Sequence, residues 1–112
     1  MICTYGKGDK VMKAYTTYHI VKTLDTITTQ WFPVKETVDR IYAIVFTRDE
    51  DLTIWGKVAY LPKNSAMAEY DIDWIMPYNE ATGEVDDTEI AIDSDWDVQW
   101  LIDEAERITK EV

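Results

Sequence analysis

Cysteine and histidine are almost absent from this 112-residue chain, which contains only Cys3 and His19. A single cysteine excludes an intramolecular disulfide framework and fits a reducing compartment. One cysteine and one histidine are also too few for a zinc site built from such residues. Stability must therefore come from packing, and a chain of this length can bury a core of its own.

Long apolar runs are also missing. The longest, residues 41–46, has six residues, which is too few to cross a bilayer. Residues 1–10 lack the apolar segment of a secretory signal. We therefore expect a soluble, cytoplasmic protein folded as a single domain over residues 1–112, with a mobile N-terminus over residues 1–10.

Catalytic motifs are missing too. The Gly-Lys-Gly stretch at residues 6–8 is too short for a phosphate loop, and neither a nucleophile elbow nor a metalloprotease helix is present. Pairs of carboxylates could support acid–base catalysis, but such pairs arise by chance among 22 acidic residues. A magnesium nuclease site on so acidic a chain would repel its own substrate. We predict a protein that is not an enzyme and binds no cofactor.

Basic residues are scarce in the last part of the chain. Residues 1–68 carry 7 acidic and 9 basic side chains, a net charge of +2, whereas residues 69–112 carry 15 acidic and 2 basic ones, a net charge of −13. Disordered acidic tails lack aromatic residues and periodicity. This segment has both, and its aromatic residues are Tyr70, Trp74, Tyr78, Trp96 and Trp100. We therefore expect folded structure to carry the charge, and its field to attract a basic partner and repel nucleic acid and anionic membranes.

What the chain does contain is a series of strand patterns followed by a helix pattern. Residues 40–47 and 52–61 are apolar and β-branched on either side of a short polar stretch, which predicts a hairpin. Residues 69–76 and 87–93 alternate between apolar and polar, which predicts two half-buried strands with acidic outer faces. If these two strands pair as a hairpin, their acidic faces lie on the same side of the sheet. The predicted class is α+β: an antiparallel sheet of about four to six strands with a C-terminal helix packed on one face.

Residues 11–30 are open to two interpretations. Nine of the fourteen residues in 16–29 are Thr, Ile or Val, which favours strands. Val11, Tyr15 and Tyr18 also fit one stripe of a helix. We favour strands.

The stretch DSDWDVQWLIDE is also ambiguous. Asp93, Asp95, Asp97 and Glu104 occupy its first, third, fifth and twelfth positions, as the ligands of a calcium-binding EF-hand loop do. However, Val98 stands where that loop needs glycine. The preceding residues alternate like a strand, whereas an EF-hand needs an entering helix.

The alternative is that the helix itself begins here. Ser94 stands at the N-cap position, and Asp95 and Asp97 lie at the helix end that favours negative charge. Apolar residues recur at helical spacing, namely Val98, Leu101, Ile102, Ala105, Ile108 and Val112. We favour the helix start over the calcium site and expect Trp100 in the core.

A run of acidic residues has a simple explanation as a solvated face, and a second one as a recognition surface. Same-face residues of a strand lie about 6.7 Å apart, which spans about two phosphates of one nucleic-acid strand. Such rows could imitate the backbone of DNA or RNA for a protein with a basic channel, with aromatic side chains as anchors. The predicted partner-binding residues are Asp71, Asp73, Asp87, Glu89, Asp93, Asp95, Asp97, Asp103, Glu104 and Glu106, together with Trp74 and Tyr78.

In size and charge the chain is similar to anti-CRISPR and anti-restriction proteins that act as DNA mimics. The resemblance rests on size and charge alone, so no functional residue is carried over from it. It implies an inhibitor borne by a phage or mobile element that blocks the basic channel of a host nuclease or defence effector. An immunity protein or antitoxin against a basic toxin nuclease would use the same physics. A structural module whose acidity only aids solubility is the third candidate.

Overall fold

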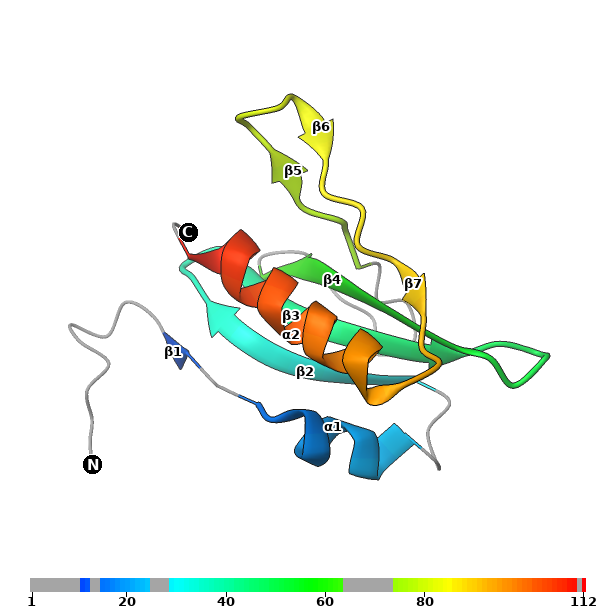
Figure 1. Ribbon diagram of the computed structural model, residues 1–112. Coiled ribbons are helices and arrows are strands. Elements are labelled where there is room, and N and C mark those ends of the chain that lie inside the picture. Colours follow the sequence, from blue (N-terminus) through cyan, green and yellow to red (C-terminus); the bar gives the residue numbers. More distant parts are fainter. Residues whose placement is uncertain (1–10, 13–14, 25–28, 64–73, 111) are drawn as a thin grey trace.

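The computed structural model describes residues 11–12, 15–24, 29–63, 74–110 and 112, and its elements form a sheet with a long helix on one face (Figure 1). In chain order they are β1 (Val11–Met12), α1 (Thr17–Leu24), β2 (Thr29–Glu36), β3 (Arg40–Arg48), β4 (Ile54–Pro62), β5 (Tyr78–Asn79), β6 (Glu84–Val85), β7 (Ile90–Ala91) and α2 (Asp95–Thr109). One sheet has the order β1–β2–β3–β4–β7, with every pair antiparallel, and β5 and β6 form a separate hairpin. The predicted α+β class, antiparallel sheet and C-terminal helix are confirmed. The N-terminal segment that we expected to be mobile lies outside the described residues.

The predicted hairpin of residues 40–47 and 52–61 is formed by β3 and β4, which pair from Arg40–Pro62 to Arg48–Ile54. The turn between them is closed by a carboxylate. Asp49 accepts hydrogen bonds from the backbone N–H groups of Asp51 and Thr53, each at 2.9 Å. Short acidic side chains favour turns because they can hydrogen-bond their own following backbone in this way.

Helix α1 shows that the strand prediction for residues 11–30 is wrong in its middle part. The hydroxyl of Thr16 accepts the backbone N–H of His19 at 3.1 Å, a contact typical of an N-cap. Ile20 and Leu24 lie one turn apart and are both buried against the main core. Full burial of such side chains contributes about 1.5–3 kcal/mol each, whereas Thr, Ile and Val cost less than about 0.7 kcal/mol each in a helix. Tertiary packing therefore outweighs the strand-favouring composition.

The sheet has an apolar cluster on each face, because successive side chains of a strand point to opposite sides. The larger cluster lies beneath the helices and contains Ile20, Leu24, Phe32, Val34, Tyr42, Ile44, Phe46, Val58, Val98, Leu101 and Ala105. The smaller cluster contains the alternating residues Ala43, Val45 and Ala59, with Trp31 and Trp74 packed against them. Helix α2 therefore has one buried side and one side that faces away from the sheet.

The edge of β4 shows that the two alternating segments do not form the second hairpin considered above. Ile75 exchanges backbone hydrogen bonds with Tyr60 at 2.8 and 2.9 Å, and β7 pairs with the other end of β4. The described parts of residues 69–76 and 87–93 therefore lie one after the other along β4 and do not pair as a hairpin. Both segments form hydrogen bonds with backbone groups at the edge of β4 that would otherwise be unpaired within the sheet. The hairpin that does form is β5–β6, which projects away from the sheet (Figure 1).

Helix α2 is held at both ends. The carboxylate of Asp97 accepts the backbone N–H groups of Asp93 and Ser94 at 2.8 and 3.1 Å, which confirms the predicted helix start. At the other end the buried ammonium of Lys35 donates to the carbonyl of Thr109 at 2.7 Å. A cation there is favoured by the helix dipole. Neither helix in the described part of the chain combines the length and apolar character needed to cross a membrane.

Candidate acidic interface

The described segment 74–110, which contains the β5–β6 hairpin, β7 and α2, carries most of the described acidic residues. Residues 74–110 contain eleven acidic side chains against two basic ones, Arg107 and Lys110. In this described segment only Asp86 and Glu104 form ion pairs, both with Arg107. Among the described residues, the other nine carboxylates of this segment form none of the ion pairs seen, so most of its negative charge is not balanced within the segment.

The predicted acidic residues fall into three places. Glu89 and Asp87 are exposed before β7, where the carboxylate of Asp87 accepts the backbone N–H of Glu89 at 3.0 Å. The others lie at the start or along the length of α2, and most are exposed: Asp93, Asp95, Asp97, Asp103, Glu104 and Glu106. Asp71 and Asp73 lie outside the described residues. The described acids thus extend from β7 along α2.

The alternation predicted for residues 87–93 holds in its side chains although only two residues form a regular strand. Thr88 is buried, and its hydroxyl accepts the backbone N–H of Val58 at 2.8 Å. Ile90 and Ile92 pack against the main core. The exposed side chains of Asp87 and Glu89 therefore point away from the main core, as the period of two requires.

The residues of the alternative calcium loop are used differently. Asp97 binds backbone N–H groups, as described above, and Glu104 accepts from Arg107 at 2.8 Å. Asp95 already belongs to α2. Over the described residues, no three or more His, Cys, Asp or Glu side chains are grouped in a way that could hold a metal ion. The arrangement is that of a capped helix.

The two predicted aromatic anchors are separated by the sheet. Trp74 lies against Trp31, with ring centroids 5.3 Å apart, on the face opposite α2. It is partly buried there and helps to cover the smaller apolar cluster. Tyr78 is 61% exposed on the β5–β6 hairpin. Only Tyr78 is available to a partner that approaches from the side of the hairpin.

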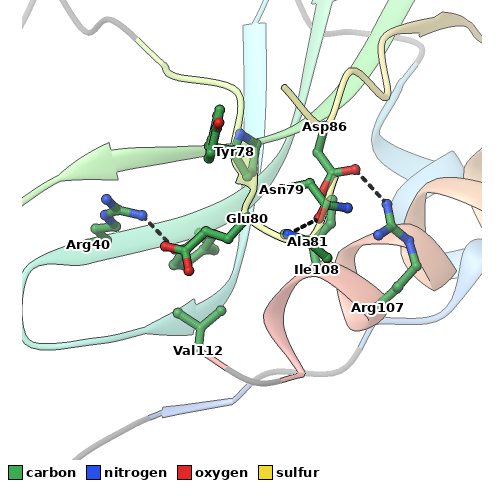
Figure 2. A pocket seen from close by; sticks show the side chains of 11 residues that line it. Arg40, Tyr78, Asn79, Glu80, Ala81, Asp86, Arg107, Ile108 and Val112 are labelled. Carbon is green, nitrogen blue, oxygen red and sulfur yellow. Dashed lines mark hydrogen bonds and ion pairs between the residues drawn. The ribbon is translucent and has the colours of Figure 1, made fainter. Parts of the chain in front are cut away.

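A cavity of about 600 Å³ lies between the β5–β6 hairpin, the end of α2 and the start of β3 (Figure 2). Arg40 and Arg107 both line it. Arg40 donates to the hydroxyl of Tyr42 at 3.0 Å, which raises the pKa of Arg40, and its guanidinium lies 4.1 Å from the ring centroid of Tyr60. Both guanidinium groups that line the cavity therefore already have hydrogen-bond partners.

Arg107 joins the hairpin segment to α2. It donates to Glu104 at 2.8 Å and to Asp86 at 3.0 Å, and Figure 2 shows its side chain directed toward Asp86. The hydrogen bonds to Glu104 and Asp86 raise the pKa of Arg107. Because this guanidinium is 47% exposed, each ion pair contributes no more than about 1 kcal/mol.

The structure places the side chains of both tryptophans on α2, Trp96 and Trp100, at least partly in solvent. Trp100 is 42% exposed, so its predicted place in the core is wrong, and Trp96 is 81% exposed. The signal was present in the sequence. Val98, Leu101 and Ala105 define the buried side of the helix, and at 3.6 residues per turn positions 96 and 100 fall opposite to it.

Comparisons with protein-family models, with curated proteins and with solved structures found no match. The function must therefore be argued from the surface itself.

Proposed function

We propose that this protein is a non-enzymatic, cytoplasmic inhibitor, borne by a phage or mobile element, that occupies the basic nucleic-acid channel of a host nuclease or defence effector. Its acidic residues would take the place of phosphates. The observation that carries the proposal is the set of nine carboxylates that form no ion pair among the described residues of 74–110, carried by the β5–β6 hairpin, the segment around β7 and α2.

The arrangement has a cost that supports a role in recognition. Like charges gathered on one surface repel each other and destabilise the compact state. The chain has a net charge of −11, and in the described segment 74–110 the ion pairs that form are those of Arg107 with Asp86 and Glu104. In contrast, Lys63 of the first half pairs with Glu36, which belongs to the same half. A surface that only aided solubility would gain nothing from excluding these cations.

The test is capture on the immobilised protein from a bacterial lysate that contains CRISPR and restriction effectors, followed by elution with duplex DNA. We expect a basic nucleic-acid-binding protein to be retained and then released by DNA. Its affinity should fall steeply as salt rises, because pairing between complementary charges is screened.

A pair of matched variants makes the test specific. Glu89→Gln with Glu106→Gln removes two exposed charges from the proposed surface, and Glu50→Gln with Asp51→Asn removes two exposed charges from the β3–β4 turn. None of these four side chains has an ion pair or a side-chain hydrogen bond in the described structure. The first variant should weaken binding, and the second should bind like the wild type. Equal binding by both variants would show that the acidic surface has no part in recognition.

An immunity protein or antitoxin that neutralises a basic toxin nuclease is the second candidate, since the same surface would serve it. The partner identified in the capture separates the two. A structural module is expected to retain no protein that nucleic acid can release.

A further inference from the structure

The outward line of α2 combines exposed indoles with carboxylates. Trp96 and Trp100 are 81% and 42% exposed and lie one turn apart, so they are neighbours on the helix surface. Monomeric proteins rarely leave tryptophans uncovered, and exposed aromatic residues are enriched where partners bind. The pair therefore needs an explanation beyond acidity.

Carboxylates surround these rings. The neighbours of Trp100 at three or four positions along the helix include Asp97, Asp103 and Glu104. Asp93 lies three positions before Trp96. A second copy of this chain would bring these carboxylates against carboxylates, which disfavours self-association through this face. A pocket rimmed by Lys and Arg complements it.

The spacing of charge along α2 distinguishes two kinds of nucleic acid. Five carboxylates lie from Asp95 to Glu106, over which a helix advances about 16.5 Å; because Glu104 pairs with Arg107, four are left, or one charge per about 4–5.5 Å. One nucleic-acid strand has a phosphate every 3.4 Å or so along the axis, and a duplex has a charge every 1.7 Å or so. The charge density of the helix is therefore closer to that of one strand than to that of a duplex, of which it has about a third.

The exposed rings point the same way. In a duplex the base faces are stacked inside, whereas a single strand offers its bases to aromatic side chains of the protein that binds it. Grooves for single strands combine cations that follow the backbone with such aromatic platforms. A charge density closer to that of a single strand, together with two exposed indoles, matches both features.

We infer that α2 imitates single-stranded nucleic acid, and that its partner is a protein whose groove is lined by Lys or Arg and by aromatic side chains that stack on Trp96 and Trp100. This inference rests on the proposed function and narrows it. Duplex-binding channels fit the surface less well, because they have no platform for the indoles.

The experiment uses the full-length protein on a column, loaded with bacterial lysate and eluted in parallel with a thymidine 30-mer or a 30-base-pair duplex at equal nucleotide concentration. The affinity of each captured protein is then measured for the wild type and for the variants Trp96→Ala, Trp96→Phe and Tyr18→Ala. Tyr18 is a matched control, because it is an aromatic residue on α1 that is 76% exposed. Circular dichroism checks that each variant is folded.

We expect a captured protein that the thymidine 30-mer releases at lower concentration than the duplex does. Its affinity should fall about 5- to 150-fold for Trp96→Ala, the loss found when one stacked ring is removed. Trp96→Phe should recover most of the binding because it restores a ring, and Tyr18→Ala should bind like the wild type.

The other outcomes separate the two proposals. Release by duplex at equal or lower concentration, with no effect of Trp96→Ala, would overturn the single-strand inference and leave the proposed function standing. Retained proteins that neither nucleic acid releases would overturn both, whether or not Trp96→Ala reduces their retention. A column that retains no protein would also overturn both.

Discussion

Helix α2 packs tightly on the sheet at Gly56, and this close approach yields a prediction of defined size. A Cβ atom at this position would lie 2.6 Å from Cδ1 of Leu101 and 2.9 Å from Cε1 of Phe46. Both side chains are fully buried, so neither can turn into solvent. Gly56→Ala must therefore push α2 away from β4 or force these side chains out of their preferred rotamers.

The cost follows from two opposing effects. Inserting an atom into a well-packed core costs about 1–3 kcal/mol. Replacing glycine returns about 0.4–1 kcal/mol, because the unfolded chain loses conformational freedom. We expect Gly56→Ala to lower the free energy of unfolding by about 1–2 kcal/mol, and the melting temperature by about 4–8 °C per kcal/mol.

The assay is urea and thermal unfolding followed by circular dichroism, with a double-mutant cycle as its control. Leu101→Ala alone should cost about 2–5 kcal/mol, but it removes the nearest atom that the new Cβ meets. In that background Gly56→Ala should cost less than half as much as it does in the wild type. A neutral or stabilising Gly56→Ala in the wild type would refute the packing described here, and with it the position of α2 on the sheet.

Three further predictions concern charge, pH and backbone strain. Glu84→Lys with Glu89→Lys changes the net charge from −11 to −7, since each reversal adds two, and both side chains are exposed. The free energy of unfolding at low salt, measured by urea unfolding, should rise by about 0.5–1 kcal/mol. The gain should vanish in about 1 M salt, because exposed charges are then screened. The pKa of Asp49 is lowered chiefly by the hydrogen bond from the indole of Trp55. The contribution of Asp49 to stability is therefore present above its ordinary pKa of 3.8 and is lost as pH falls through the lowered pKa. Trp55→Phe should raise the pKa of Asp49, measured by NMR titration of its carboxyl carbon, and an unchanged pKa would contradict this role of Trp55. Leu52 has a φ of 67°, a left-handed conformation that is energetically costly for a residue with a Cβ, and its side chain is 73% exposed. Leu52→Gly should therefore raise the free energy of unfolding, measured in urea, by about 0.5–1 kcal/mol. A lower free energy of unfolding would contradict a left-handed backbone at this position.

Much of the fold was predictable because several elements are specified by local pattern. The β3–β4 hairpin follows from two β-branched runs around a polar turn, and α2 follows from an apolar stripe with acidic residues at its start. In both cases the side chains that favour the element are also the ones that it buries. Sequence and packing then agree, and the prediction holds.

The elements that were missed depend on contacts distant in sequence. Nothing local makes residues 17–24 helical apart from Thr16 and the spacing of Ile20 and Leu24, whose burial needs a core built by later strands. Likewise the alternation of residues 69–76 and 87–93 shows that each has two faces. It does not show that both would lie along β4, because alternation carries no information about the neighbouring strand.

For the interface, the sequence indicated the exposure of individual acids but not their grouping. The carboxylates before β7 and along α2 point outward as their periodicity requires. Which aromatic residues accompany them depends on the sheet, which places Trp74 on the opposite face against Trp31. Trp100 was assigned to the core by counting apolar residues, whereas its angular position relative to Val98 and Leu101 was the better guide.

Because Arg107 forms ion pairs with both Asp86 and Glu104, it competes with any partner for these two carboxylates. This one guanidinium tethers Asp86, beside the β5–β6 hairpin, to Glu104 in the middle of α2. A lysine or arginine from an incoming protein that binds either carboxylate would compete with Arg107 for it. Contact at this point would then weaken an ion pair that joins the hairpin segment to α2.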